Sequence, residues 1–600
     1  MWAHGALTFH FSERNEPRTK ASLQSPFLAL ILGTLLGIVA AIATMGIWSA
    51  TVAARVVAII AFGLLGRTSM TPLRGHITQQ QNRERFQKFG MFLVALLACS
   101  GAANSQAWFP PDTPPPFNAG SALQLTDGNI MVQESSTSNW WKLTPNNFGL
   151  YHSGTWSKLA SFPASMNYAP RLFASAVLPD GRVIIEGGEY NNGIKNWTHK
   201  GAIYDPVANF WTPVNPPTGW TTIGDAQSVV LPDGTFMLAN KCPVPCTGGT
   251  IKAKAALLDA ANLTWTVLNG TGGYIGKLDE NTEEGWTLLP NGDLLTVDTY
   301  ICEISCYTPN GMNSEIYNPI TGVWSSAGST VVQLWDSQAA CGEATKYEVG
   351  PAALRPDGTV FATGANGCAG EPAHTAIYDT TTGTWTPGPN IPVGTQGTFN
   401  DMADAPAAVL PDGNVLIDSS PGIDKGPSTL FEFNGTGFIT IPQPGLGPAV
   451  SSESGRMLVT PIGTILFIHA ATTNMWFYQT SGTYQSSWQP NICSSCFPAT
   501  VSVGGTYTVS GTQFNGLTQG AFYGDDYQSA TNYPLVRITN DQTQHVFYAR
   551  THGFSTMGVA TGAEIVSTKF DVLSGTETGP STMVVAANGI PSNVVDIMVK

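Results

Sequence analysis

Short runs of alternating apolar and polar residues recur along most of the chain, and each meets a second, β-branched run at an Asp-Gly or Asn-Gly dipeptide. Such a dipeptide between two runs predicts two antiparallel strands joined by a tight turn. Seven of these hairpins follow one another at intervals of 50 to 66 residues. Their turns lie at Asp127, Asp180, Asp233, Asn291, Asp357, Asp412 and, in a degenerate last copy, at Gly463.

Each hairpin is followed by two further predicted strands. The third strand carries a Tyr or Leu before a polar turn, as at Tyr204, Leu258, Tyr317 and Tyr378. The fourth strand carries one aromatic residue: Trp156, Trp211, Trp265, Trp324, Trp385, Phe438 and Tyr484. Because one four-stranded sheet cannot bury its faces alone, four strands at a period near fifty residues predict a β-propeller. A row of sandwich domains would need about a hundred residues per repeat.

The expected fold is therefore all-β, with a seven-bladed propeller over residues 118–490. A Pro-rich linker over 108–117 precedes it, and alternating strand patterns continue over 491–600 in a further β-domain. Only 11% of the residues are charged, while Gly (64) and Pro (41) are abundant. This composition is typical of a turn-rich β-protein whose surface relies on Ser, Thr and Asn.

The first 69 residues contain an apolar segment over 27–48 that is long enough to cross a bilayer. It is either a transmembrane helix or part of an upstream sequence read as coding, with translation beginning near Met70. Residues 70–107 form a second signal, in which basic residues precede the apolar run 90–98 and small residues follow it. This order is typical of a secretory signal peptide.

Two processing sites fit the end of this signal. "LLAC" resembles a lipoprotein box that would place a lipid on Cys99, and "SQA" before Trp108 would serve as an ordinary cleavage site. Both predict an exported protein, either secreted or associated with the cell envelope and anchored to a membrane only through its N-terminal segment.

The exported part is acidic. Beyond Ala107 there are 18 Lys and Arg against 38 Asp and Glu, a balance of −20. This sign argues against nucleic acid or an anionic membrane surface as a partner.

Apart from Cys99, the chain has eight cysteines, and their close spacing predicts four local disulfides. Zinc held by "CPVPC", "CEISC" and "CSSC" is the alternative, but no His lies near these three motifs in the sequence, and an oxidising compartment favours disulfides. The candidate pairs are Cys242 and Cys246, Cys302 and Cys306, Cys341 and Cys368, and Cys493 and Cys496.

Carboxylates recur in the segments that lead into the first strand of the repeats, which in a propeller rise around the mouth of the channel. They are Asp225, Glu283, Glu284, Glu348, Asp404 and Glu453. Converging carboxylates either raise their pKa or bind a cation, and an oxygen-rich ring suits calcium. A pair of them could also act as general acid and base on a sugar. The simplest alternative is that each accepts hydrogen bonds from the backbone of its own loop.

Three tryptophans lie close to these carboxylates in the sequence: Trp220, Trp286 and Trp335. Exposed indoles beside carboxylates suit carbohydrate binding, whereas buried indoles would pack between blades.

The hairpin "LPDGRVIIEGG", with Gly187 and Gly188, and the strands ending in Tyr and Trp resemble kelch repeats. Residues 118–600 are similar to the galactose oxidase and glyoxal oxidase group of copper radical oxidases. The resemblance implies a seven-bladed kelch propeller followed by an immunoglobulin-like β-sandwich over 491–600. It also implies one copper held by two tyrosines and two histidines, with a cysteine cross-linked to one tyrosine.

The ligand set of that group is largely missing here. Leu172 stands in the place of one ligand tyrosine, and the late repeats lack the Tyr-His pair. Tyr151 and His152 copy that pair, but they precede a fourth strand instead of a first. His552 is the one plausible counterpart of a ligand histidine.

The sequence therefore favours a binding or scaffolding protein over a copper radical oxidase. Its ligand would be a cation, a carbohydrate or another envelope component at an acidic channel mouth, and calcium fits better than copper. The alternatives are a copper-dependent oxidase with a divergent ligand set that includes His552, and a hydrolase built on the acidic ring.

Overall fold

The computed structural model describes residues 106–240, 255–268, 277, 281, 283–299, 312–336, 348–447, 449–524 and 529–600. All of them belong to one compact unit that spans Ala102–Lys600. Among these residues, no helix is both long and apolar enough to cross a bilayer. The segments 27–48 and 90–98 lie outside the described residues.

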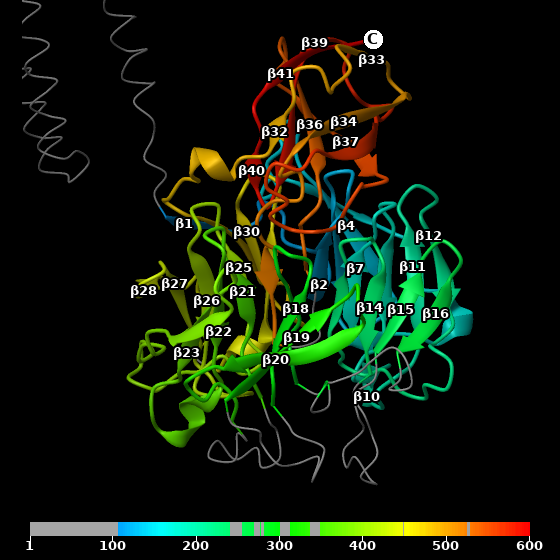
Figure 1. Cartoon of the computed structure of the whole chain (residues 1–600). Helices are drawn as coiled ribbons and strands as arrows, with labels where there is room; N and C mark the ends of the chain where they lie inside the picture. The colour runs from blue at the N-terminus through cyan, green and yellow to red at the C-terminus, as the bar shows by residue number, and fades with distance from the viewer. Residues whose placement is uncertain are drawn as a thin grey trace, which may run out of the picture. The chain divides into compact units, whose positions relative to one another are not determined.

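The regular structure of this unit is all-β, with a few short 3-10 helices, and consists mainly of small antiparallel sheets (Figure 1). In the first four sheets the strands lie side by side in chain order. The first sheet contains β2 (Ala119–Gln124), β3 (Ile130–Glu134), β4 (Trp140–Thr144) and β5 (Thr155–Lys158); the second, β7 (Ala174–Val177), β8 (Val183–Glu186), β11 (Gly201–Asp205) and β12 (Phe210–Val214); the third, β13 (Ser228–Val230), β14 (Phe236–Ala239), β15 (Ala255–Asp259) and β16 (Thr264–Leu268); the fourth, β17 (Thr287–Leu288), β18 (Leu294–Val297), β19 (Asn313–Asn318) and β20 (Val323–Ser329).

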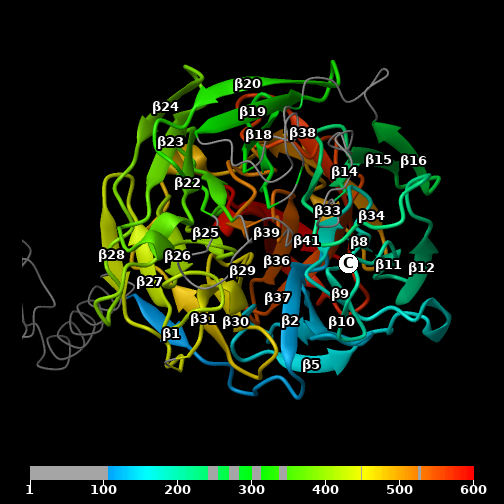
Figure 2. The same cartoon turned by 90° about the horizontal axis from the view of Figure 1, so that it is seen from below.

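Three more sheets of the same kind follow, and Figure 2 shows the sheets arranged around a ring in chain order. The fifth contains β21 (Ala352–Leu354), β22 (Thr359–Thr363), β23 (Thr375–Asp379) and β24 (Thr384–Pro387); the sixth, β25 (Ala407–Val409), β26 (Val415–Ser419), β27 (Thr429–Phe433) and β28 (Phe438–Ile441); the seventh, β29 (Gly455–Val459), β30 (Ile465–His469), β31 (Met475–Gln479) and β1 (Ala107–Phe109).

The predicted hairpin turns are confirmed in every sheet. The glycine of each turn has a positive φ, between 82° and 89°, which a residue with a Cβ adopts only with strain. These glycines are Gly128, Gly181, Gly234, Gly292, Gly358, Gly413 and Gly463.

The third and fourth strands pair in a fixed register that joins the repeated aromatic residues. Tyr204 lies directly opposite Trp211, with ring centroids 5.1 Å apart. Tyr317 and Trp324 (5.3 Å) and Tyr378 and Trp385 (5.0 Å) repeat the same pair. Directly opposed aromatic side chains are a stabilising cross-strand contact.

The prediction for the fourth strand of the last repeat was wrong. Tyr484 lies beyond β31, and the sheet is completed instead by β1, which comes from the other end of the unit. Trp108 of β1 lies opposite Tyr478 with ring centroids 4.7 Å apart, so the seventh sheet has the same aromatic pair. The first two residues of the predicted linker 108–117 therefore belong to a strand of the seventh sheet.

The short strands β6 (Pro170–Arg171), β9 (Tyr190–Asn191) and β10 (Ile194–Lys195) form a three-stranded sheet. The C-terminal strands form a separate sheet system around a core that includes Val509, Phe570 and Met583. The first half of β37 pairs with β36 and its second half with β38, so this strand joins two halves of the system. The strands are β32 (Asn491–Ile492), β33 (Thr500–Val501), β34 (Thr506–Thr512), β36 (Leu535–Asn540), β37 (Val546–His552), β38 (Val566–Asp571), β39 (Gly579–Ala587), β40 (Ile590–Pro591) and β41 (Val595–Val599).

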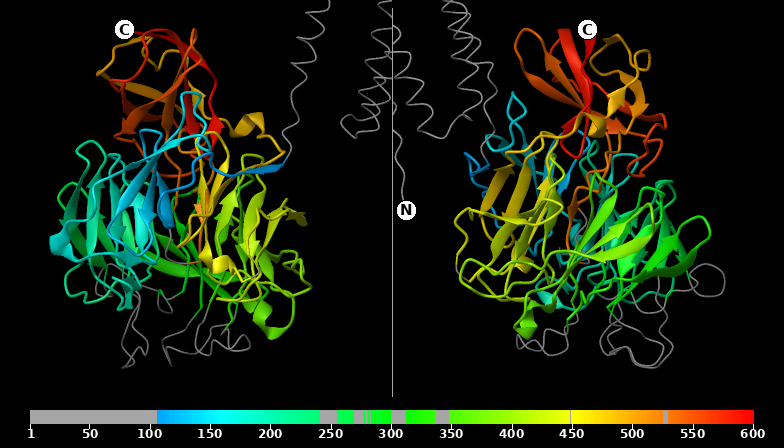
Figure 3. Two further views of the ribbon diagram at one scale, coloured as in Figure 1. Left: turned by 180° about the vertical axis from the view of Figure 1, so that it is seen from behind. Right: turned by 60° about the vertical axis from the view of Figure 1, so that its left-hand side comes forward.

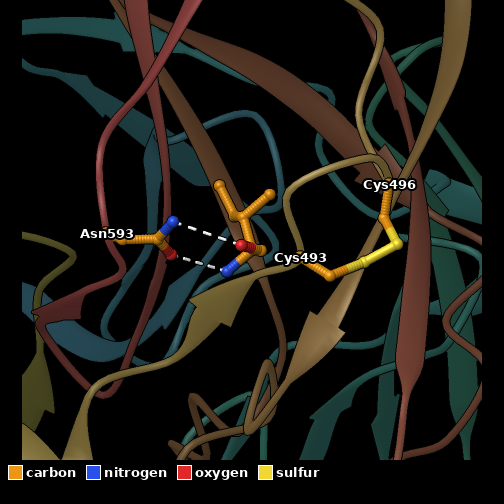
Figure 4. The surroundings of a disulfide bond; sticks show 4 residues. Cys493, Cys496 and Asn593 are labelled. Carbon is orange, nitrogen blue, oxygen red and sulfur yellow. Dashed lines mark hydrogen bonds between the residues drawn. A yellow bond between two sulfur atoms is a disulfide. The ribbon is translucent and has the colours of Figure 1, made fainter.

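One predicted disulfide is confirmed, between Cys493 and Cys496 (Figure 4). It follows β32, whose Ile492 is held on both sides by Asn593: the Ile492 amide donates to Oδ1 (2.7 Å), and Nδ2 donates to the Ile492 carbonyl (3.1 Å). The other six candidate cysteines, or their side chains, lie outside the described residues.

The C-terminal strands pack against the hairpin turns of the ring (Figure 3). The amides of Thr551, Gly553 and Met557 donate to carbonyls of Thr126, Pro179 and Pro232, which lie at the turns of the first three sheets. The turns therefore lie at the covered ends of the sheets, and the entry loops that precede the innermost strands lie at the opposite ends.

A segment between β34 and β36 runs along the innermost strands of the ring. Its strand β35 (Ala521–Phe522) pairs with β25 of the sixth sheet. Gln519 accepts from the Leu288 amide in the fourth sheet (2.8 Å), and the Tyr533 hydroxyl donates to the Gln124 carbonyl in the first (2.5 Å). Contacts with sheets on different sides of the ring place this segment in its centre.

We predict that Gly128→Ala lowers the melting temperature much more than Gly219→Ala. Both glycines have φ near 80°, but a Cβ on Gly128 would overlap the ring of Tyr548, whereas nothing lies within 4 Å of a Cβ on Gly219. The Gly219 variant should cost about 1 kcal/mol through backbone strain alone, and the Gly128 variant about 2–4 kcal/mol. Equal shifts in thermal unfolding would contradict this packing of the turn.

Candidate functional site

The six predicted mouth carboxylates all precede an innermost strand, as expected. Asp225 precedes β13, Glu283 and Glu284 precede β17, and Glu348, Asp404 and Glu453 precede β21, β25 and β29. Their environments differ, however, and the structure brings only three of them together.

Glu283, Glu348 and Asp404 form a carboxylate trio. One oxygen of each lies within 4.8 Å of the others. The three residues come from the entry loops of the fourth, fifth and sixth sheets, which are neighbours in the ring. Calcium binds oxygen at about 2.3–2.6 Å, so ligands on either side of it lie up to about 5 Å apart. The spacing therefore fits a single hard cation held between three sheets.

The backbone around the trio is held in fixed, unusual conformations. Glu283 (φ 56°) and Asp404 (φ 46°) both adopt the left-handed region. Glu348 is 3% exposed, and its amide and carbonyl form a two-way bridge with Asp336 (2.9 and 3.0 Å). Such strain is tolerated only where the surroundings fix the chain, and it is common in binding sites.

The central segment also packs against this trio. A Cβ on Gly524 would lie 2.5 Å from Oδ1 of Asp404, and a Cβ on Gly285 would lie 2.7 Å from the Gly524 carbonyl. The loops that carry Asp404 and Glu283 are thus in close contact with the same point of the central segment, which requires glycine there.

Glu284 belongs to a different cluster, although it is adjacent to Glu283 in the sequence. Its carboxylate is buried and lies 3.2 Å from Nζ of Lys277, which also contacts Glu315 (2.7 Å) and Asp298 (3.5 Å). The Lys277 side chain is 1% exposed. Glu284 is thus part of a buried ion-pair network, and the prediction that it faces the channel mouth was wrong.

Asp225 and Glu453 do not join the trio either. Asp225 is buried. Burial lowers the pKa of Lys195, but the hydrogen bond and charge of Glu189, with smaller contributions that include Asp225, raise it. Glu453 accepts hydrogen bonds from the hydroxyls of Ser451 (3.2 Å) and Ser454 (3.0 Å) in the 3-10 helix Ser452–Ser454. Glu453 therefore bonds within its own loop, but to serine hydroxyls and not to the backbone that the alternative named.

The tryptophans near the loops mainly support the core. Trp220 (6% exposed) and Trp286 (2%) belong to the main hydrophobic cluster, and Trp335 is half-buried. The two buried indoles cannot stack on a sugar, so the packing alternative holds for them.

The residues that bear on copper lie apart from the trio. His552 is in β37, where Nε2 lies 3.3 Å from Oδ1 of Asp571 and its strand neighbour Gly553 bonds to Pro179 at the turn end of the second sheet. The trio lies at the entry ends. Tyr151 is buried, and its hydroxyl donates to the Gly128 carbonyl (2.5 Å), while the ring of His152 stacks on Phe109. Tyr151 and His152 are therefore structural.

The trio offers only carboxylate oxygens. Copper in proteins prefers imidazole and thiolate donors, whereas carboxylates suit calcium, magnesium or manganese. The donor set around Glu283, Glu348 and Asp404 does not fit the copper centre that the family resemblance implies.

Two buried carboxylic acid side chains were not predicted as site residues from the sequence. Glu186 ends β8 and Asp418 lies in β26, and both are 0% exposed. The Glu186 carboxyl has no hydrogen-bond partner among the described residues, and the Ser428 hydroxyl is the polar group beside Asp418. Burial raises the pKa of Glu186 well above its usual range and that of Asp418 to about 7. Glu186 lies six residues after Asp180, and Asp418 lies six residues after Asp412, the aspartates of the two hairpin turns. An acidic residue inside a strand rich in β-branched residues is the sequence signal that could have identified both.

Comparisons with known proteins agree with the kelch resemblance. No protein-family model matches the chain. A kelch-like protein, terF, from Aspergillus terreus is 28% identical over 141 residues, which cover 23% of this chain and 26% of that protein. The chain thus matches only about a quarter of the length of this curated relative. The chain resembles kelch-repeat proteins.

Two solved structures are also similar to this one. A fungal alcohol oxidase of the AA5 family, in complex with copper, has a TM-score of 0.41 and 14% identity, and covers 83% of this chain and all of its own. YjhT has a TM-score of 0.29 and 14% identity, and covers 56% of this chain and 99% of its own. Copper and alcohol oxidation are properties of the first of these proteins.

We predict that Lys277→Met destabilises the protein by about 3–5 kcal/mol, because three buried carboxylates would lose their shared cation. Lys195→Met is the control: that lysine side chain is 48% exposed, and its pair with Glu189 should contribute about 0–1 kcal/mol. Thermal or urea unfolding measures both. A Lys277 variant as stable as the control would contradict the ion-pair network.

Asp418 should make stability depend on pH. Its pKa is about 7 in the folded protein and near 3.8 when unfolded, so the folded state holds the proton more tightly. The part of the free energy of unfolding that depends on protonated Asp418 is therefore fully present below about pH 4. It is lost as the pH rises from about 4 to 7, and the loss is a few kcal/mol at about 1.36 kcal/mol per pKa unit.

Asp418→Asn removes this titration. We expect its melting temperature to exceed that of the wild type above pH 7, and the difference to shrink toward pH 4. Asp596→Asn, whose side chain is exposed in β41, controls for a change of charge. A constant difference across the pH range would contradict the assignment.

Proposed function

We propose that this chain is an exported, envelope-associated binding protein: a seven-bladed kelch propeller that holds a hard divalent cation at its mouth, followed by an immunoglobulin-like domain. The carboxylate trio of Glu283, Glu348 and Asp404 carries the proposal. Seven sheets arranged in a ring and a C-terminal sheet system that shares a strand between two halves support the finer fold assignment.

Calcium is the cation that this donor set fits best. Three carboxylates would supply a charge of −3 and leave further coordination positions for water or ligand oxygens, since calcium takes six to eight oxygens. A carbohydrate or another oxygen-rich envelope component is the class of partner that such a cation would bind. Because the trio joins three neighbouring sheets, the cation would also stabilise the ring.

Binding would require little rearrangement. The loops of Glu283 and Asp404 are already fixed in left-handed conformations, and both contact Gly524. A preorganised site loses less conformational entropy on binding. Repulsion between three converging carboxylates would instead favour opening of these loops when the cation is removed.

We expect calcium to raise the melting temperature of the wild-type protein, and Glu348→Gln and Asp404→Asn each to weaken calcium affinity about ten- to a hundredfold, because affinity depends on the number of charged ligands. Asn tolerates the left-handed conformation, so Asp404→Asn should fold. Isothermal titration calorimetry measures affinity, and terbium luminescence locates the site.

Glu453→Gln is the matched control and should bind calcium like the wild type. Unchanged affinity in Glu348→Gln and Asp404→Asn would contradict the proposal. One tightly held copper per chain that is lost in His552→Ala would instead establish the oxidase alternative.

A further inference from the structure

The N-terminal strand β1 is the feature from which we draw a new inference. It completes the seventh sheet in the same way as the internal fourth strands complete theirs. In those strands, the residue before the aromatic residue pairs with the last residue of the third strand, as Phe210 does with Asp205 and Thr384 with Asp379. Ala107 pairs with Gln479 in the equivalent position. The repeated pattern therefore includes Ala107 as well as Trp108.

Gln106 extends the contact further. Its Nε2 donates to Oε1 of Glu432 (3.2 Å) and contacts the hydroxyl of Tyr478, which itself donates to Glu432. Tyr478 (0% exposed) belongs to the seventh sheet and Glu432 (3%) to the sixth. Gln106 thus joins two neighbouring sheets where the ring closes.

Trp108 anchors the same strand. Its Nε1 donates to the Pro442 carbonyl (2.8 Å), and its ring packs on Tyr478 and on Phe467, 5.8 Å between centroids. A chain cut between Ala107 and Trp108 would keep the Trp108 side chain. It would lose the backbone pairing of Ala107 with Gln479 and the side-chain amide of Gln106 that donates to Glu432. It would also place a charged terminal amine at the start of β1, beside a buried tyrosine.

We propose that Gln106 and Ala107 remain in the mature protein, so that removal of the preceding apolar segment occurs by hydrolysis of a peptide bond upstream of Gln106 and not at the "SQA" site before Trp108. The assignment rests on the proposed export. If export precedes folding, β1 pairs with the seventh sheet only after export. The residues that follow the cleavage site would then be those that complete the ring.

The test is the mature N-terminus of the full-length chain, expressed with its own signal in a bacterial host and recovered from the envelope or medium. Mass spectrometry of the N-terminal peptide should show Gln106 and Ala107, with a start between Cys99 and Gln106. Ala107→Leu, which blocks cleavage after residue 107, should leave the mature mass otherwise unchanged. A start at Trp108, or processing abolished in Ala107→Leu, would overturn the proposal.

A second measurement tests the contact itself. Gln106→Ala should lower the melting temperature of the exported protein by about 2 °C or more, because a buried carboxylate loses a donor. Gln479→Ala is the control, since the single acceptor of its Nε2 among the described residues is the neighbouring Thr480 carbonyl at 3.4 Å. Equal melting temperatures for Gln106→Ala and the wild type would overturn the proposal. A chain that is never exported would refute the export assignment and leave this contact intact.

Discussion

The structure depends on one constraint: a four-stranded sheet with two apolar faces is stable only when neighbours cover both of them. Aromatic residues of the outer strands meet this need by contacting the neighbouring sheet, as Trp211 of the second sheet packs against Trp140 of the first with ring centroids 5.5 Å apart. The seventh sheet cannot meet it from its own repeat. It takes its last strand from residues 107–109, and the pair of Trp108 and Tyr478 closes the ring.

Closure of the ring brings the entry loops of different sheets together at its centre. The innermost strands are short, and the loops that precede them converge from different sheets. The C-terminal domain covers the turn ends and sends one segment along the innermost strands, where Gly524 meets the loops of Glu283 and Asp404. A scaffold of this kind fixes loops whose own sequences have little regular structure, and carboxylates on such loops can be held close together despite their repulsion.

The period and the turn dipeptides were sufficient to predict the all-β fold, the hairpins and the loops that carry the acids, since Asp-Gly turns and β-branched strands are local signals. Closure by β1 could not be predicted, because it pairs residues more than 350 positions apart. The two adjacent acids Glu283 and Glu284 show the same limit: one joins the trio and the other pairs with Lys277 in the core. Their separation follows from the left-handed turn at Glu283, which has no signature in the sequence.

We propose above all that the mouth of the ring holds a hard cation between three sheets. The most direct test is a crystal of the protein soaked with terbium, with data collected at the terbium absorption edge. We expect one strong anomalous peak between the carboxylates of Glu283, Glu348 and Asp404, displaced by excess calcium. A mouth without a peak, or a terbium site on other residues alone, would contradict it.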